Sequence, residues 1–174
     1  MHEDGAIIER VLAGETEAFR LLVERYQGPL FGLLGTLLPA AEREDIAQDT
    51  FLTAFDRLAQ YDAERGRFST WLLTIGRNKA LNHLQKRRPL PMADPPETAD
   101  PVTPATRLDE DEWFRRLDAA LDGLPPEQKA VFVLADVHGL SYEEIGAVEQ
   151  TELGTVKSRL SRARRKLRAL LGRD

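Results

Sequence analysis

The stretch that decides the fold is residues 141–171, SYEEIGAVEQTELGTVKSRLSRARRKLRALL. Ser141 is followed three residues later by Glu144, which is the spacing of a capping box at the start of a helix. A short helix is expected there, followed by a turn at residues 150–152. The apolar residues beyond this turn recur in steps of three and four, which predicts a longer helix that ends near residue 171. This apolar stripe consists of Leu153, Val156, Leu160, Ala163, Leu167 and Leu170.

A short helix, a three-residue turn and a longer basic helix form the layout of a helix-turn-helix. Residues 153–173 contain eight basic side chains and no acidic one. Like charges four residues apart destabilise a helix, so a polyanionic partner explains this charge better than the alternative, a solvated face on a packing helix. Some arginines of such a helix can bind guanine edges in the major groove, and the others can bind phosphates.

The composition excludes several classes of function. The 174 residues include no cysteine, so disulfides, thiolate metal sites and a cysteine nucleophile are ruled out, as in proteins of a reducing compartment. The three histidines have no metal-ligand spacing, and no glycine-rich phosphate loop occurs. The longest apolar run, residues 30–41, is too short to cross a bilayer, and the first residues do not resemble a signal peptide. We therefore expect a cytoplasmic protein that is not an enzyme, needs no cofactor or metal and does not insert into membranes.

The prolines divide the chain into two parts. Six of the ten lie in residues 89–104, and residues 89–112 carry a net charge of −6. Proline prevents regular structure and the charge opposes collapse, so this segment is expected to be an extended linker. Helical periodicity prevails elsewhere. The prediction is an all-α protein with two small helical domains, at residues 1–88 and 108–174, joined by a Pro-rich acidic linker at residues 89–107.

In the first domain, apolar residues predict a helix through Tyr26, a second apolar piece at residues 30–38 and a long helix at residues 42–60. The long helix is expected to bury a face that includes Phe51 and Phe55. Its other side carries carboxylates stacked around a leucine, which suits docking of a basic partner helix because the carboxylates repel one another. The alternative is a solvated face with one stray leucine. The stripe consists of Asp45, Asp49, Leu52 and Asp56.

A loop at residues 61–69 and a helix to about residue 88 complete this domain. Tyr61 and Phe68 stand in the loop among arginines, and the helix combines Trp71 with the amides of Asn78 and Asn82. Aromatic rings and amides among cations suit the binding of unstacked bases. The alternative is that Trp71 and Phe68 belong to the core.

These residues resemble the extracytoplasmic function (ECF) type of bacterial RNA polymerase sigma factor, which has only the second and fourth sigma domains. The resemblance covers nearly the whole chain. It is highly specific, because two independent blocks of sequence occur in the right order and at the right distance. The matching segments are EDIAQDTFLTAFDRLAQYD (44–62), RFSTWLLTIGRNKALNHLQKRR (67–88), LPPEQKAVFVL (124–134) and HGLSYEEIGAVEQTELGTVKSRLSRARRKL (138–167).

The resemblance implies a transcription initiation factor that binds core RNA polymerase and directs it to promoter DNA. Residues matching the surface that binds the clamp helices of the largest polymerase subunit are Asp45, Gln48, Asp49, Leu52 and Asp56. Residues implied in recognition and melting of the minus-ten element are Tyr61, Phe68, Trp71, Arg77, Asn78, Asn82 and Lys86. Residues implied in recognition of the minus-thirty-five element are Thr155, Lys157, Ser158, Ser161, Arg162 and Arg165. An anti-sigma factor is a further expected partner.

Three residues depart from the family pattern. Gln150 stands where a glycine is common, Gly146 where alanine is usual, and Glu152 adds an acid near the expected phosphate path. A stand-alone helix-turn-helix regulator is the rival hypothesis from another class, but it leaves the acidic stripe and the helix after residue 69 without a role. A sigma mimic that titrates an anti-sigma factor is a second rival, which would not need an intact basic reading helix.

Overall fold

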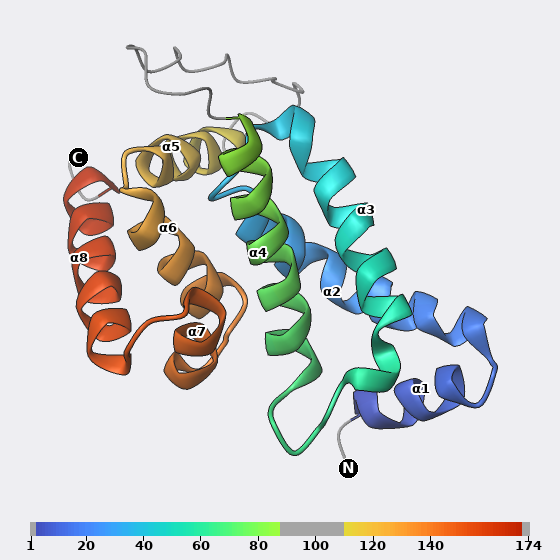
Figure 1. Ribbon diagram of the computed structural model, residues 1–174. Coiled ribbons are helices and arrows are strands. Elements are labelled where there is room, and N and C mark those ends of the chain that lie inside the picture. The colour runs from blue at the N-terminus through green and yellow to red at the C-terminus, as the bar shows by residue number, and fades with distance from the viewer. Residues whose placement is uncertain (1–2, 88–109, 172–174) are drawn as a thin grey trace.

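The computed structural model describes residues 3–87 and 110–171, and every regular element within these ranges is a helix (Figure 1). The all-α prediction is therefore confirmed for the described residues. The predicted linker, residues 89–107, lies outside them. The N-terminal half consists of α1 (Glu3–Leu12), η1 (Thr16–Ala18), α2 (Phe19–Leu34), α3 (Ala40–Asp56), η2 (Leu58–Gln60) and α4 (Phe68–Arg87). The C-terminal half consists of α5 (Glu110–Asp122), α6 (Pro126–Phe132), the π-helical turn η3 (Val133–Val137), α7 (Tyr142–Glu149) and α8 (Leu153–Leu171).

Helix α2 runs without a break through Pro29, where the sequence pattern suggests two separate apolar pieces. A proline inside a helix removes one backbone hydrogen bond and costs about 3 kcal/mol. Leu22, Leu30 and Leu33 are fully buried on this helix, on both sides of the proline. Their burial against α3 and α4 offsets the local cost, so tertiary packing overrides the local signal.

The main core is shared by the two halves. Leu30, Leu33 and Leu73 from the N-terminal half pack in one cluster with Leu134 and Ile145 from the C-terminal half. Figure 1 shows the corresponding arrangement, with α7 lying directly beside α4. The sequence, which suggests two separate helical bodies, does not anticipate this common core.

Smaller clusters stabilise each end of the molecule. Around α1, an apolar cluster contains Ile8, Phe19 and Phe68. At the opposite end, Leu124 of the turn before α6 packs against Leu167 of α8. The expectation that Phe55 is buried is wrong, because its side chain lies at the edge of the α2–α3 packing with 36% of its surface exposed.

The helix-turn-helix forms as the sequence predicts. The Ser141 hydroxyl accepts a hydrogen bond from the backbone N–H of Glu144 at 3.2 Å, and the Glu144 carboxylate accepts one from the backbone N–H of Ser141 at 2.8 Å. Gln150 ends α7 in the left-handed conformation, with φ of 52°. A Cβ at Gly146 would lie 3.0 Å from the carbonyl oxygen of Thr151, so this tight turn accounts for glycine where alanine is usual.

Candidate nucleic-acid and polymerase interfaces

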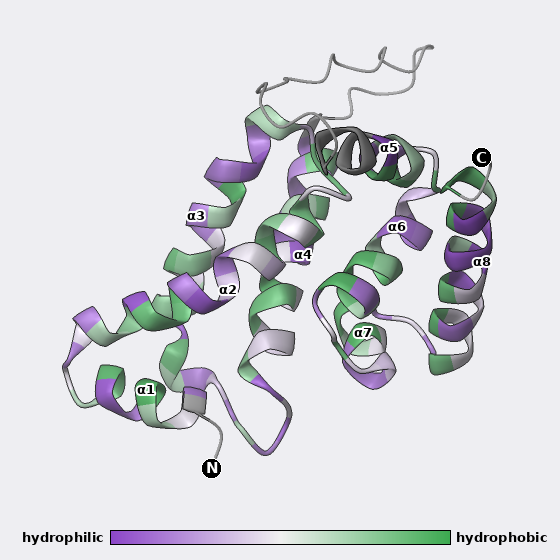
Figure 2. Ribbon diagram, turned by 180° about the vertical axis from the view of Figure 1, so that it is seen from behind, coloured by the Kyte–Doolittle hydropathy of each residue, from purple (hydrophilic) through white to green (hydrophobic). Residues whose placement is uncertain are grey.

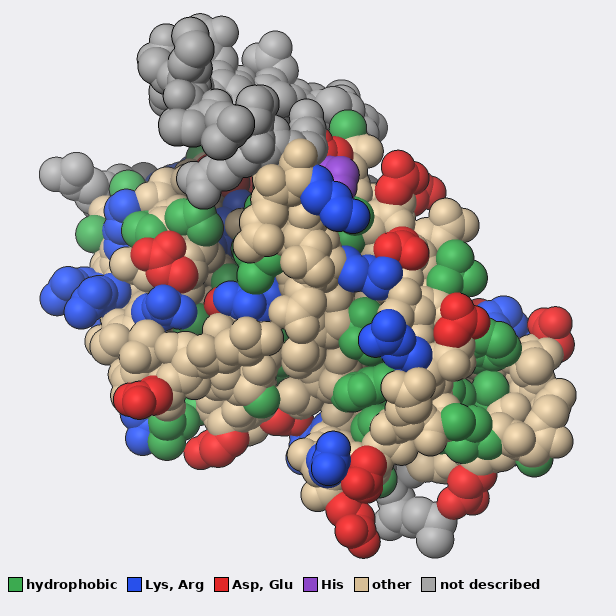
Figure 3. Space-filling view, in the orientation of Figure 1, with side chains coloured by type: hydrophobic (Ala, Val, Ile, Leu, Met, Phe, Trp, Pro, Cys, Tyr) green, Lys and Arg blue, Asp and Glu red, His purple; other side chains and the backbone are tan. Residues whose placement is uncertain are grey.

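Helix α8 presents its basic residues away from the core. Its stripe is buried at the centre and exposed at the two ends, Leu153 and Leu170. The helix therefore shows alternating hydrophilic and hydrophobic bands (Figure 2), and Lys and Arg side chains gather over it at the edge of the molecule (Figure 3). Thr155, the first of the predicted minus-thirty-five residues, is half-buried. The exposed ones are Lys157, Ser158, Ser161, Arg162 and Arg165.

Two cations of α8 are engaged in contacts within the chain. Arg164 donates two hydrogen bonds to the carboxylate of Asp136 in η3, the one from Nε at 2.9 Å. These hydrogen bonds raise the pKa of Arg164 above its usual value. Lys166 donates to the carbonyl oxygen of Gly123. Arg164 and Lys166 therefore hold α8 against the rest of its half, whereas Arg162 and Arg165 project into solvent.

The acidic face of α3 is exposed as predicted. Asp45, Gln48, Asp49, Leu52 and Asp56 all lie on the surface, and 58% of the Leu52 side chain is exposed. The Asp49 carboxylate also accepts a hydrogen bond at 2.5 Å from Lys79 of α4, which holds α3 and α4 together.

Beside this face lies an apolar groove of 370 Å³ between α2 and α3. Six residues of α3 line this groove: Glu44, Ala47, Gln48, Phe51, Leu52 and Phe55. The sequence interpretation missed the α2 wall, although its residues are spaced four apart and so share one helix face. The α2 wall consists of Phe19, Val23, Gln27 and Phe31.

The aromatic residues near the loop at residues 61–67 are packed against one another. The Phe68 ring lies 5.5 Å from those of Tyr26 and Tyr61 and 5.7 Å from that of Trp71, measured between centroids. Phe68 is only 1% exposed, because α4 begins at this residue and directs the ring inward. In this conformation the ring is part of the core, as the alternative interpretation has it, and no base can stack on it.

Tyr61 and Trp71 remain half-buried and border the loop. The Tyr61 hydroxyl donates a hydrogen bond to the carbonyl oxygen of Gly66 at 2.9 Å, which closes the loop on itself. Burial raises the pKa of Tyr61 above its ordinary value, so its hydroxyl remains a donor at neutral pH. Gly66 has a φ of 155°, which a residue with a side chain rarely adopts.

The remaining minus-ten candidates follow one side of α4. Asn78, Asn82 and Lys86 are four residues apart and exposed, so they share one face of the helix. Arg77 is only 17% exposed, because Glu149 of α7 lies against it. The structure thus brings the α4 face and the helix-turn-helix together.

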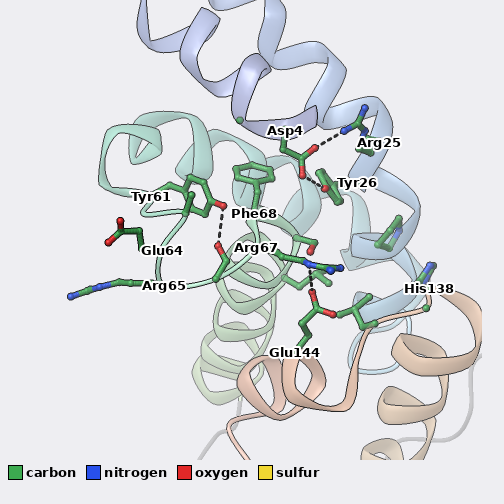
Figure 4. Close-up of a pocket in the computed structure, with 18 of the residues that line it drawn as sticks. Asp4, Arg25, Tyr26, Tyr61, Glu64, Arg65, Arg67, Phe68, His138 and Glu144 are labelled. Carbon is green, nitrogen blue, oxygen red and sulfur yellow. Dashed lines mark hydrogen bonds and ion pairs between the residues drawn. The ribbon is translucent and has the colours of Figure 1, made fainter. Parts of the chain in front are cut away.

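A cavity of 850 Å³ lies between the two halves, beside this loop (Figure 4). On one side, Asp4 accepts hydrogen bonds from Arg25 and Tyr26, each at 2.5 Å. On the other side, Arg67 forms an ion pair with Glu144 of α7 at 3.5 Å. Most of the charge around the cavity is therefore already compensated within the chain.

Comparison with known proteins connects these surfaces to one family. The model of Sigma-70 region 2 matches residues 22–89, and the model of Sigma-70, region 4 matches residues 114–167. The chain is 35% identical to the ECF RNA polymerase sigma-E factor of Haemophilus influenzae over 173 residues, which cover 92% of this chain and 91% of the relative. It is 34% identical to the RNA polymerase sigma-H factor of Pseudomonas aeruginosa over 175 residues, with coverage of 93% and 90%.

Two solved structures are similar over nearly the whole chain. CnrH in complex with the cytosolic domain of CnrY has a TM-score of 0.69 at 28% identity, and the similarity covers 97% of each chain. The sigma factor RpoE in complex with the anti-sigma factor NepR from Bartonella quintana has a TM-score of 0.67 at 25% identity, with coverage of 90% of this chain and 98% of RpoE. The chain therefore belongs to the ECF family of RNA polymerase sigma factors, and it is a sigma factor that directs promoter recognition and transcription initiation.

Proposed function

We propose that this sigma factor works through three separate surfaces: the groove and acidic face of α2 and α3 bind core polymerase, α4 binds the minus-ten element and α8 binds the minus-thirty-five element. The observation that carries the proposal is the presence of the exposed basic helix α8 and the exposed acidic, apolar face of α3 in one chain. A stand-alone DNA-binding regulator needs only the first of these. We assign the surfaces to residues 1–88 and 108–174, with residues 89–107 as the linker.

The polymerase surface combines two kinds of contact. Apolar side chains of the groove, with Leu52 at the rim, supply surface that a partner helix can bury. The carboxylates of Asp45, Asp49 and Asp56 surround this rim and favour a basic partner, which fits the clamp helices of the largest subunit. Apolar burial gives affinity, and charge selects the partner and its orientation.

The two DNA surfaces bind different forms of DNA: α8 is assigned to the duplex and α4 to the melted strand. On α8, Arg162 and Arg165 can reach base edges or phosphates, while Ser158 and Ser161 can form shorter contacts. On α4, the amides of Asn78 and Asn82 and the ring of Trp71 suit a base turned out of the duplex. The core position of Phe68 removes it from this set, so Tyr61 and Trp71 are the aromatic residues assigned to bases.

We further propose an anti-sigma factor as a regulatory partner, because the similar sigma factor RpoE was solved in complex with an anti-sigma factor. The chain is assigned no catalytic activity and no cofactor, since the initiation chemistry belongs to the polymerase. Within residues 3–87 and 110–171, no helix combines the length and apolar character that crossing a membrane requires. We place its action in the cytoplasm, where RNA polymerase and promoter DNA are found.

The test is transcription by purified core polymerase with and without this chain. Run-off product from DNA fragments selected by the reconstituted enzyme should depend on the chain. Arg162→Ala should lower the yield from promoters with a strong minus-thirty-five element, and Arg168→Ala is the matched control because it removes the same charge further along α8. Equal yield with core polymerase alone would contradict the proposed function.

A further inference from the structure

A carboxylate from η3 lies against the basic helix α8. Each oxygen of Asp136 accepts a hydrogen bond from the guanidinium of Arg164, and the bond from Nε measures 2.9 Å. Such a paired arrangement is among the strongest contacts that an arginine makes with a carboxylate. The Arg164 side chain is 41% exposed and that of Asp136 26%. The pair therefore lies at the border between the surface of α8 and the rest of its half.

Arg164 belongs to a helix face that is otherwise assigned to DNA. Residues that follow one another in steps of three and four share one face of a helix, and such a series passes through Arg164. Its other members are exposed, and two of them are proposed minus-thirty-five residues. The series consists of Lys157, Ser161, Arg164 and Arg168. A free guanidinium at residue 164 would therefore be a further cation for the DNA backbone.

Apolar packing holds α8 in place on both sides of this ion pair. Val156 and Leu160 precede Arg164 and belong to the main core, whereas Leu167 follows it and packs in one cluster with Leu124. These buried side chains dominate the stability of the helix, because a partly exposed ion pair contributes little. Asp136 can therefore be altered with little expected change in the fold.

A DNA phosphate is a poor competitor for Arg164. It binds a guanidinium in the same paired manner as a carboxylate, so an exchange of partners would gain no stronger contact. The exchange would leave the carboxylate of Asp136, which is only 26% exposed, without its cation and close to the phosphates. The lost hydrogen bonds and the repulsion between anions both oppose it. Arg164 should therefore stay with Asp136 when α8 binds DNA.

We propose that Asp136 withholds Arg164 from DNA and so lowers the affinity of α8 for DNA of any sequence by one phosphate contact. This inference rests on the proposed binding of α8 to the minus-thirty-five element. A phosphate contact strengthens binding to every sequence alike, and nonspecific sites far outnumber specific ones. Withholding one cation leaves the choice of site to side chains that can reach bases, such as Arg162. Asp136 acts through Arg164, so it is a positioning residue.

The experiment measures how steeply promoter binding depends on salt, because each phosphate contact adds about 0.9 to the slope of log K against log salt concentration. Holoenzyme reconstituted with each variant is titrated with fluorescent promoter fragments selected as in the run-off assay, between about 50 and 200 mM salt. Asp136→Ala should steepen the slope by about 0.9, because Arg164 is released to a phosphate. Over this range the variant should lose about 3- to 4-fold more affinity than the parent.

Further variants separate the release of Arg164 from other effects of the lost charge. Arg164→Gln should keep the parental slope, and Asp136→Ala combined with Arg164→Gln should return to it. Asp122→Ala is the matched control. It also removes a carboxylate and frees a cation, but this cation is Lys129 of α6 and does not lie on α8. The control should keep the parental slope.

An unchanged slope for Asp136→Ala would overturn the proposal. So would a double variant as steep as Asp136→Ala, because the charge of Asp136 would then act on DNA directly. A shallower slope for Arg164→Gln would overturn it as well, since Arg164 would already contact DNA in the parent, and this variant decides the question even if Asp136→Ala alters the fold. Run-off transcription by the parent on the same fragments tests the proposed function separately.

Discussion

Phe19 of α2 and Phe55 of α3 meet edge to face, with ring centroids 5.1 Å apart and planes at 76°. Both rings line the groove assigned to polymerase, and Phe55 remains 36% exposed. An edge-to-face pair contributes about 0.5–1.5 kcal/mol beyond its burial, so it helps to fix the shape of the groove before a partner arrives.

Leu52→Ser should weaken binding to core polymerase by about 1–2 kcal/mol, or roughly 5- to 30-fold in Kd, because it removes apolar surface that only the partner buries. The Tm should hardly change, since the side chain is 58% exposed. Titration with labelled core polymerase measures the effect. Leu12→Ser, which alters a leucine on α1 that is 54% exposed, is the control and should bind normally.

Arg162→Ala should reduce discrimination for the minus-thirty-five element by about 1–3 kcal/mol if the arginine binds a guanine edge. Competition between specific and unrelated duplexes, with the assembled holoenzyme, separates this effect from general phosphate binding. Arg168→Ala should weaken both duplexes about equally. If Arg162→Ala also weakened both equally, Arg162 would be a phosphate contact.

Asn78→Ala should slow formation of the open complex by roughly 2- to 10-fold, which corresponds to the loss of one hydrogen bond to a base. Permanganate reactivity of the melted thymines follows the rate, and closed-complex binding should persist. Gln85→Ala, an exposed amide on the same helix, should open the promoter at the parental rate.

Phe68→Ala should lower the free energy of unfolding by about 3–5 kcal/mol, because it leaves a cavity among Tyr26, Tyr61 and Trp71. Urea denaturation followed by circular dichroism measures this loss. Phe31→Ala removes a ring that is 41% exposed and should cost far less. If Phe68→Ala lowered the free energy of unfolding only slightly, Phe68 would not be a core residue and would again be a candidate for binding bases.

Acidification should destabilise the packing around His138. Burial lowers the pKa of His138 below the ordinary value of 6.5, so the folded chain binds its proton less readily than the unfolded chain. The stability contribution is therefore complete above about pH 6.5 and declines as the pH falls below it.

Denaturation midpoints between pH 7.5 and pH 5.5 would show this decline, and His138→Gln isolates it from other titrating groups. The difference in denaturation midpoint between the parent and His138→Gln should become smaller as the pH decreases. A difference that does not change with pH would show that His138 makes no such contribution.

Local signals determined much of this protein. The capping box at Ser141, the stripe on α8 and the acidic face of α3 depend on residues a few positions apart, so spacing alone predicts them. Helix periodicity shows which residues share a face, and charge indicates which faces avoid the core. These features suffice for the helical class and for the α3 and α8 surfaces.

Long-range packing decided the rest. Continuation of α2 through Pro29, burial of Phe68 and exposure of Phe55 depend on which helices meet, and a helix pattern does not specify its neighbour. The contact of Gln150 with Asn78 joins residues 72 positions apart. No periodicity encodes such a contact, because it arises only when the apolar faces of the two halves find each other and fix the polar side chains at their border.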